Sequence, residues 1–174
     1  MNIRVKRIAL TGILAACALL SFLLESVLPP LFLPGAKLGL SNIFSVIALI
    51  VLTPVDAVII LVVRVTLGCL IVGNPIAIIY ALAGGLVSLF VMTVLIYFVK
   101  RVSVVCASVA GGVVHNIVQT VVFSAVTGSP YMLNLLPYYV LLGVLSGAVV
   151  GFIVYFLVKK TKVWRDFFIA TEER

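Results

Sequence analysis

The stretch "RIALTGILAACALLSFLLESVL", residues 7–28, decides the fold class because it is long and almost entirely apolar. Its only charged residues are Arg7, at the first position, and Glu25, close to the end. About 20 apolar residues in a helix are enough to cross the hydrocarbon core of a bilayer. The stretch therefore predicts a membrane-spanning helix.

The beginning of this stretch also resembles a lipoprotein signal, in which a basic segment and a short apolar run precede Leu-Ala-Ala-Cys. Here that pattern ends at Cys17. A cleaved signal has a short apolar core, whereas this run continues past Cys17 to Leu28. The length of the run favours an uncleaved span over a lipidated cysteine.

Composition extends the same conclusion to the whole chain of 174 residues, which is 64% hydrophobic and 10% charged. Soluble domains are about 25% charged, so we expect one integral membrane domain over residues 1–174. The net charge of +7 does not indicate a nucleic-acid partner, because the basic residues flank apolar runs. The expected surroundings are a lipid bilayer.

Prolines, glycines and charges divide the chain into six predicted spans and a cytoplasmic tail at 159–174. Every backbone polar group must be satisfied inside a membrane, which favours helices for all six spans. The predicted fold is thus an all-α integral membrane protein with six transmembrane helices. The predicted spans are 7–28, 37–53, 55–72, 76–99, 102–126 and 135–158.

The distribution of lysine and arginine predicts the orientation. Cytoplasmic ends of membrane proteins carry an excess of both residues. One side of the predicted bundle receives ten of them, while the other side receives only Lys37. We therefore expect both termini in the cytoplasm and a multi-pass protein of the bacterial cytoplasmic membrane.

Small residues recur at spacings that allow membrane helices to approach closely. The last span carries Gly143, Gly147 and Gly151 at intervals of four. Such residues serve either packing inside the bundle or docking of another membrane subunit. Span 1 is the best candidate for docking, because its small residues, in Thr11-x-x-x-Ala15 and Gly12-x-x-x-Ala16, lie in the predicted cytoplasmic half.

Seven polar residues near or within the spans form the predicted ligand site. A charged group within the membrane is unfavourable by about 2.5–3.5 kcal/mol on insertion scales, which makes such groups functional candidates. If they share one pocket in the outer half, its balance is positive and suits a phosphate, a carboxylate or an electron-rich carbonyl system. The seven residues are Glu25, Lys37, Asn42, Arg64, His115, Asn116 and Gln119.

Structural roles for the same residues stay open at this point. Glu25 and Arg64 can simply pair, and His115 can bond to a carbonyl of a neighbouring helix. Asn116 and Gln119 can join helices, as polar side chains often do in membranes. Lys37 can extend to lipid headgroups.

No enzymatic motif is present in the sequence. A phosphate-binding loop and a zinc-protease motif are both missing, and the five acidic residues are too scattered for a magnesium–diphosphate site. The cysteines Cys17, Cys69 and Cys106 lack metal-ligand spacing. We therefore predict no catalytic residue, no metal, no intrinsic cofactor and no enzymatic activity, with the identity of the ligand unknown.

Four segments resemble a known family: "PGAKLGLSN" (34–42), "RVTLGCLIVGNP" (64–75), "AGGLVS" (83–88) and "GGVVHNIVQ" (111–119). They are similar to the Gx transporter family, which also carries the name heptaprenyl diphosphate synthase component I. That group is similar in turn to the S-components of energy-coupling factor transporters. The resemblance implies an S-component-like bundle with a ligand pocket in its outer half. It also implies that span 1 docks a membrane coupling subunit, with ATPase subunits as further partners. The docking motif of S-components is Ala-x-x-x-Ala, and its nearest match here is Gly12-x-x-x-Ala16, which differs at the first position.

The function predicted from these observations is a substrate-binding membrane subunit of a small-molecule transporter. The resemblance suggests a vitamin-, flavin- or isoprenoid-precursor-like ligand. Two alternatives stay open, namely an accessory component of a heptaprenyl diphosphate synthase and a membrane subunit associated with a quinone or flavin.

Overall fold

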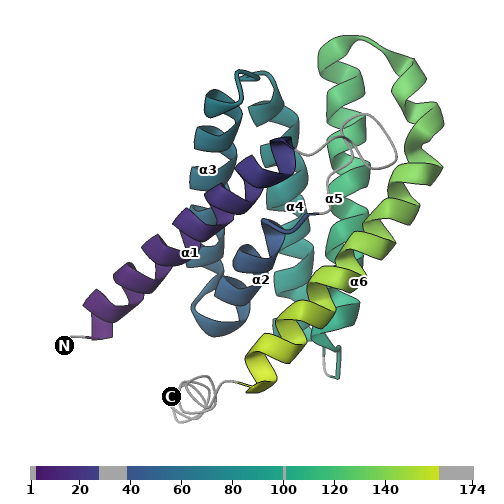
Figure 1. Ribbon diagram of the computed structural model, residues 1–174. Coiled ribbons are helices and arrows are strands. Elements are labelled where there is room, and N and C mark those ends of the chain that lie inside the picture. The colour runs from purple at the N-terminus through teal and green to yellow at the C-terminus, as the bar shows by residue number, and fades with distance from the viewer. Residues whose placement is uncertain (1–2, 28–38, 100, 161–174) are drawn as a thin grey trace.

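The computed structural model describes residues 3–27, 39–99 and 101–160, which are almost entirely helical (Figure 1). No strand occurs within these ranges, so the predicted all-α class is confirmed. The helices are α1 (Ile3–Val27), α2 (Asn42–Val51), α3 (Pro54–Ile71), α4 (Ala77–Phe98), α5 (Val104–Thr127), the 3-10 helix η1 (Pro130–Leu135) and α6 (Leu136–Lys160).

Five helical segments are long and apolar enough to cross a membrane, with α6 and η1 together forming the last of them. Their bounds lie within a few residues of the predicted spans. Large apolar side chains cover their outer surfaces; Ile8, Leu24 and Phe90, for example, are 73%, 69% and 67% exposed. Such a surface suits a lipid environment, where exposed apolar side chains carry no hydration penalty.

Helix α2 differs from its prediction, because it has 10 residues instead of the expected 37–53. It follows Gly39, whose φ of 75° is rarely adopted by other residues. It ends before Thr53, whose side chain accepts a hydrogen bond from the Asp56 N–H and so caps α3. At 1.5 Å per residue, α2 is about 15 Å long and α3 about 27 Å, so α2 alone is too short to cross a bilayer.

Helices α2 to α6 form a closed ring. Contacts join α2 to α3, α3 to α4, α4 to α5, α5 to α6 and α6 back to α2, while α1 contacts α2 and α3 from outside. The start of α1 and the end of α6 lie at the same end of the bundle, called here the terminal end (Figure 1). The connections α2–α3 and α4–α5 also lie there, so α2 runs from about mid-height to the terminal end.

The glycines of α6 pack against α5 and not against an outside partner. A Cβ atom on Gly143 would lie 2.7 Å from the Gly112 backbone oxygen, and one on Gly147 would lie 2.5 Å from the Ser108 backbone oxygen. A Cβ atom on Gly151 would lie 2.8 Å from the Val105 Cα. These distances show that the three glycines of α6 serve packing inside the bundle and not the docking of another subunit.

Candidate functional site

An internal cavity lies among α2, α4, α5 and α6, with Leu61 of α3 contributing to its wall. The volume of this cavity is about 30 Å³, which is room for about two water molecules. The lining combines the polar residues Asn42, Ser45, Ser88, Ser108, His115 and Ser146 with Gly39, Val46, Leu61, Gly85, Leu89, Met92, Gly112, Gly147 and Val150.

The cavity extends from near the terminal end to about mid-height. In α5, a helix of 24 residues, Ser108 is about 6 Å and His115 about 17 Å from the first residue, at 1.5 Å per residue. The same scale gives the whole helix a length of about 36 Å. The pocket predicted in the outer half of the bundle depends on the orientation of the chain across the membrane, which stays a prediction.

Polar atoms without partners concentrate at this cavity. Across the described residues, four buried side-chain polar atoms lack a hydrogen-bond partner: Ser45 Oγ, Arg64 Nε, Ser108 Oγ and His115 Nδ1. Ser45, Ser108 and His115 all line the cavity. Buried polar groups are normally paired, and each unpaired one destabilises the fold by about 1–3 kcal/mol. The concentration of unpaired atoms at one cavity therefore indicates a place where water or another small hydrogen-bonding molecule can bind.

The short α2 helix places its first turn at this cavity. Asn42 and Ser45 both line it, and the Asn42 N–H donates a 2.9 Å hydrogen bond to the Gly39 oxygen. Because α2 begins inside the bundle, its N-terminal end lies beside the cavity and not at the membrane surface.

A charged cluster lies next to this site. The Arg64 Nη1 donates a hydrogen bond to Ser41 Oγ, and Ser41 Oγ donates to Glu25 Oε2 at 3.5 Å. The other carboxylate oxygen of Glu25 accepts a 2.8 Å hydrogen bond from the Leu40 N–H. Glu25 and Arg64 are 7% and 3% exposed and are joined through the Ser41 hydroxyl. Their opposite charges therefore compensate each other inside the bundle.

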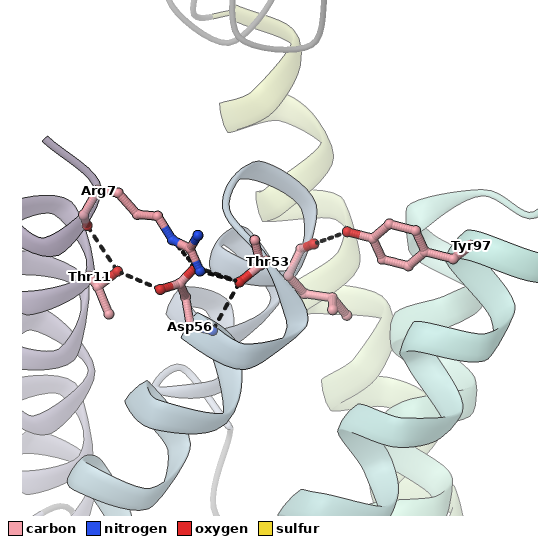
Figure 2. A network of polar contacts seen from close by, with 6 residues as sticks. Arg7, Thr11, Thr53, Asp56 and Tyr97 are labelled. Carbon is pink, nitrogen blue, oxygen red and sulfur yellow. Dashed lines mark hydrogen bonds and ion pairs between the residues drawn. The ribbon is translucent and has the colours of Figure 1, made fainter. Parts of the chain in front are cut away.

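A second charged network joins α1 to the start of α3 through hydrogen bonds and an ion pair (Figure 2). The Arg7 guanidinium forms a 2.8 Å ion pair with Asp56 and donates a 2.8 Å hydrogen bond to Thr53 Oγ1. The Thr11 hydroxyl donates to the other Asp56 oxygen at 3.2 Å. On the far side of the α2–α3 connection, the Tyr97 hydroxyl donates to the Leu49 oxygen at 3.1 Å. These contacts fix α1 and α2 to the rest of the bundle near its terminal end.

Comparison with known families identifies a match over most of the chain. The sequence model of the family described as heptaprenyl diphosphate synthase component I matches residues 14–157. The chain belongs to this family. No curated protein and no solved structure matches it. In this family member the cavity residues Asn42 to Val150 all fall within the matched range, whereas Arg7 and Gly12 precede it.

The structure separates the predicted site residues of this heptaprenyl diphosphate synthase component I family member into three groups. Asn42 and His115 line the cavity, and Gln119 lies one turn further along α5 on the same helix face as His115. Glu25 and Arg64 form the adjacent charged cluster. Asn116 donates a 2.8 Å hydrogen bond to the Tyr139 oxygen and so joins α5 to α6, while Lys37 lies outside the described residues.

Sequence reasoning did not identify the cavity serines. Ser45, Ser88, Ser108 and Ser146 come from four different helices and meet only in the folded bundle. One usable signal was the spacing of Ser108 and His115, which are seven residues apart and so share a helix face. No three His, Cys, Asp or Glu side chains gather as possible metal ligands in the part of the chain that the structure describes.

Proposed function

We propose that this protein is a substrate-binding membrane subunit of a small-molecule transporter, and that its ligand binds in the internal cavity. The observation that carries the proposal is the position of the unpaired Ser45, Ser108 and His115 atoms on the lining of one cavity. A bound molecule that hydrogen bonds to these atoms would remove the penalty of burying them unpaired. The position of the first turn of α2 at the same cavity supports this proposal.

The exposed face of α1 is the proposed docking surface for a membrane coupling subunit and its ATPase subunits. Gly12 and Ala16 are both exposed there, and a Cβ atom on Gly12 would meet nothing within 4 Å. Small residues allow a partner helix to approach closely in a membrane. Since α1 supplies none of the described cavity lining, a partner on this face would leave the ligand site intact.

We expect a small molecule to remain bound to the wild-type protein when it is purified gently from the membranes of its natural host. Ser45→Ala and Ser108→Ala should retain about 5- to 10-fold less of this molecule, since a hydrogen bond contributes about 1–1.5 kcal/mol. Neither variant should be less stable, because the deleted hydroxyls have no partner in the folded chain. Mass spectrometry of the released small molecules measures the amount retained.

Two further variants complete this experiment. Ser124→Ala removes a buried hydroxyl that bonds to the Ser129 oxygen, away from the cavity, and should retain the molecule as the wild type does. Ala16→Trp should retain the molecule but lose co-purifying membrane subunits. Equal retention by Ser45→Ala, Ser108→Ala and the wild type, or no retention by any of them, would contradict the proposed ligand site.

A second candidate function follows from the family description, which names one component of a synthase. In this alternative the protein assists a separate catalytic subunit that builds a prenyl diphosphate chain. Adding the purified protein to such a subunit would then raise the rate or length of chain extension, as measured with radiolabelled isopentenyl diphosphate. An unchanged rate and product length would exclude this alternative.

A further inference from the structure

The internal cavity has room for about two water molecules. A larger molecule can therefore bind there only after part of the cavity wall has moved. Packed helices resist compression and shift instead between discrete arrangements, in which one helix moves against its neighbours. The contacts of each helix that lines the cavity indicate which part of the wall can move.

Helices α4, α5 and α6 form the fixed part of the wall, because their backbones are in close contact. A Cβ atom on Gly84 of α4 would lie 2.8 Å from the His115 backbone oxygen of α5. A Cβ atom on Gly112 of α5 would lie 2.5 Å from the Gly143 backbone oxygen of α6. Movement of either pair of helices would break such contacts along their whole length.

Helix α2 lines the cavity without a glycine contact of this kind. Seven of its 10 residues are buried, because its inner side lies at the cavity and α1 covers it from outside (Figure 1). The covering side of α1 carries Thr11, Leu14, Ala15 and Ala18, which are all buried. Helix α2 therefore cannot leave the cavity until α1 has moved.

Polar contacts tie α1 to the chain just beyond each end of α2. Before its first turn, the Leu40 N–H donates a 2.8 Å hydrogen bond to Glu25 of α1. After its last turn, Arg7 of α1 forms the ion pair with Asp56 and donates a hydrogen bond to Thr53 (Figure 2). Both ties must loosen before α1 can move away from α2.

The buried charge pair stabilises the closed arrangement. Glu25 belongs to α1, whereas Arg64 belongs to α3, and the Ser41 hydroxyl joins them. The Arg64 Nε has no partner even with Glu25 in place, so removal of α1 would leave this buried cation still less well paired, which is unfavourable. Opening is therefore rare in the isolated protein and requires a partner that holds α1 in a displaced position.

We infer that α1 is a clamp that holds α2 against the cavity, and that a membrane subunit bound to the exposed face of α1 opens the cavity by displacing α1. This inference rests on the proposed function, since it assigns the regulation of the same site. It links the two parts of that proposal physically. Gly12 and Ala16 of the docking face lie on the same helix as Arg7 and Glu25, whose contacts hold the clamp closed.

Weakening one tie tests the clamp without a partner subunit. Arg7→Ala removes the ion pair and the hydrogen bonds near the terminal end of the bundle. Amide hydrogen exchange in detergent, measured by mass spectrometry, should then be about five- to tenfold faster at residues 42–51 than in the wild type. Loss of hydrogen bonds of this strength changes the frequency of local opening by about that factor.

Two comparisons show whether the effect is confined to the clamp. Peptides 105–112 and 143–151, from the contact between α5 and α6, should exchange at the wild-type rate in Arg7→Ala. Lys6→Ala removes a neighbouring exposed cation from the same helix and is the matched control. It should leave the exchange of all three segments unchanged.

A cysteine in the fixed wall shows whether the same movement opens the cavity. Ser108→Cys would be made in a chain whose native cysteines are replaced by alanine, and treated with the uncharged reagent 2-hydroxyethyl methanethiosulfonate. The closed cavity has no room for this reagent, so the modification rate measures opening. It should be about five- to tenfold higher in the presence of Arg7→Ala than in the presence of Lys6→Ala.

Unchanged exchange at residues 42–51 in Arg7→Ala would overturn the clamp, and so would an unchanged modification rate of Ser108→Cys. Equal acceleration in α2, α5 and α6 would also overturn it, because Arg7→Ala would then destabilise the whole bundle. These outcomes leave the proposed ligand site standing. That site depends instead on the retention of a small molecule by the wild type and its loss from Ser45→Ala and Ser108→Ala.

Discussion

Replacing Gly147 with alanine is expected to destabilise the bundle by about 1–3 kcal/mol, the usual range for an overpacked core. The added Cβ atom would lie 2.5 Å from the Ser108 backbone oxygen and 2.8 Å from the Val109 Cα. Backbone atoms cannot rotate away as a side chain can, so α5 and α6 must separate along their contact. Thermal unfolding in detergent, followed by circular dichroism, measures the loss of stability.

Gly12→Ala is the matched control, because it makes the same chemical change in another long helix. A Cβ atom on Gly12 would meet nothing within 4 Å, so only the difference in helix propensity applies. That difference favours alanine by about 1 kcal/mol, and the control should unfold at the same temperature as the wild type or slightly higher. Equal destabilisation by both changes would show that the close contact between α5 and α6 is absent in solution.

The contrast between these two glycines shows what the sequence can and cannot predict. Intervals of four identify a face of small residues on a helix, but they do not say which neighbour that face meets. Gly147 contacts α5, whereas Gly12 is exposed. The difference depends on how each helix is rotated within the bundle, and that rotation is a property of the whole fold.

Helix positions were largely predictable, because long apolar runs end at recognisable residues. Pro54 and the Gly73-Asn74-Pro75 turn mark the bounds of α3 closely. The short length of α2 was not predictable from hydropathy, since Leu38 and Leu40 continue the apolar pattern before Asn42. The positive φ of Gly39 is incompatible with a helix that continues through this position, and no sequence pattern distinguishes Gly39 from other glycines.

The candidate site was predicted only in part for a similar reason. His115 and Asn42 are conspicuous as polar residues in apolar runs, and both line the cavity. Serine is common in membrane helices as a small packing residue, so Ser45 and Ser108 carry no distinctive signal. The link from Arg7 to Asp56 joins residues 49 positions apart, which a single sequence does not reveal.

Replacing Glu25 with glutamine is expected to be the more severe of the two changes argued here. Glutamine keeps the shape of the side chain and can still accept the hydrogen bond from the Leu40 N–H. It removes the negative charge that offsets Arg64, which is only 3% exposed. A buried charge that loses its partner destabilises a protein by about 3–5 kcal/mol, so the variant should unfold at a clearly lower temperature.

A double-mutant cycle separates loss of the charge pair from any general effect of changing Glu25. Arg64→Met alone leaves the Glu25 charge buried at 7% exposure and should also destabilise the bundle. The double variant Glu25→Gln with Arg64→Met removes both charges. Its loss of unfolding free energy should therefore be smaller than the sum of the losses in the two single variants, by at least about 1 kcal/mol. Additive losses would mean that Glu25 and Arg64 do not compensate each other. In that case the uncompensated charge of Arg64 would lie next to the cavity, and an anionic ligand would again be favoured.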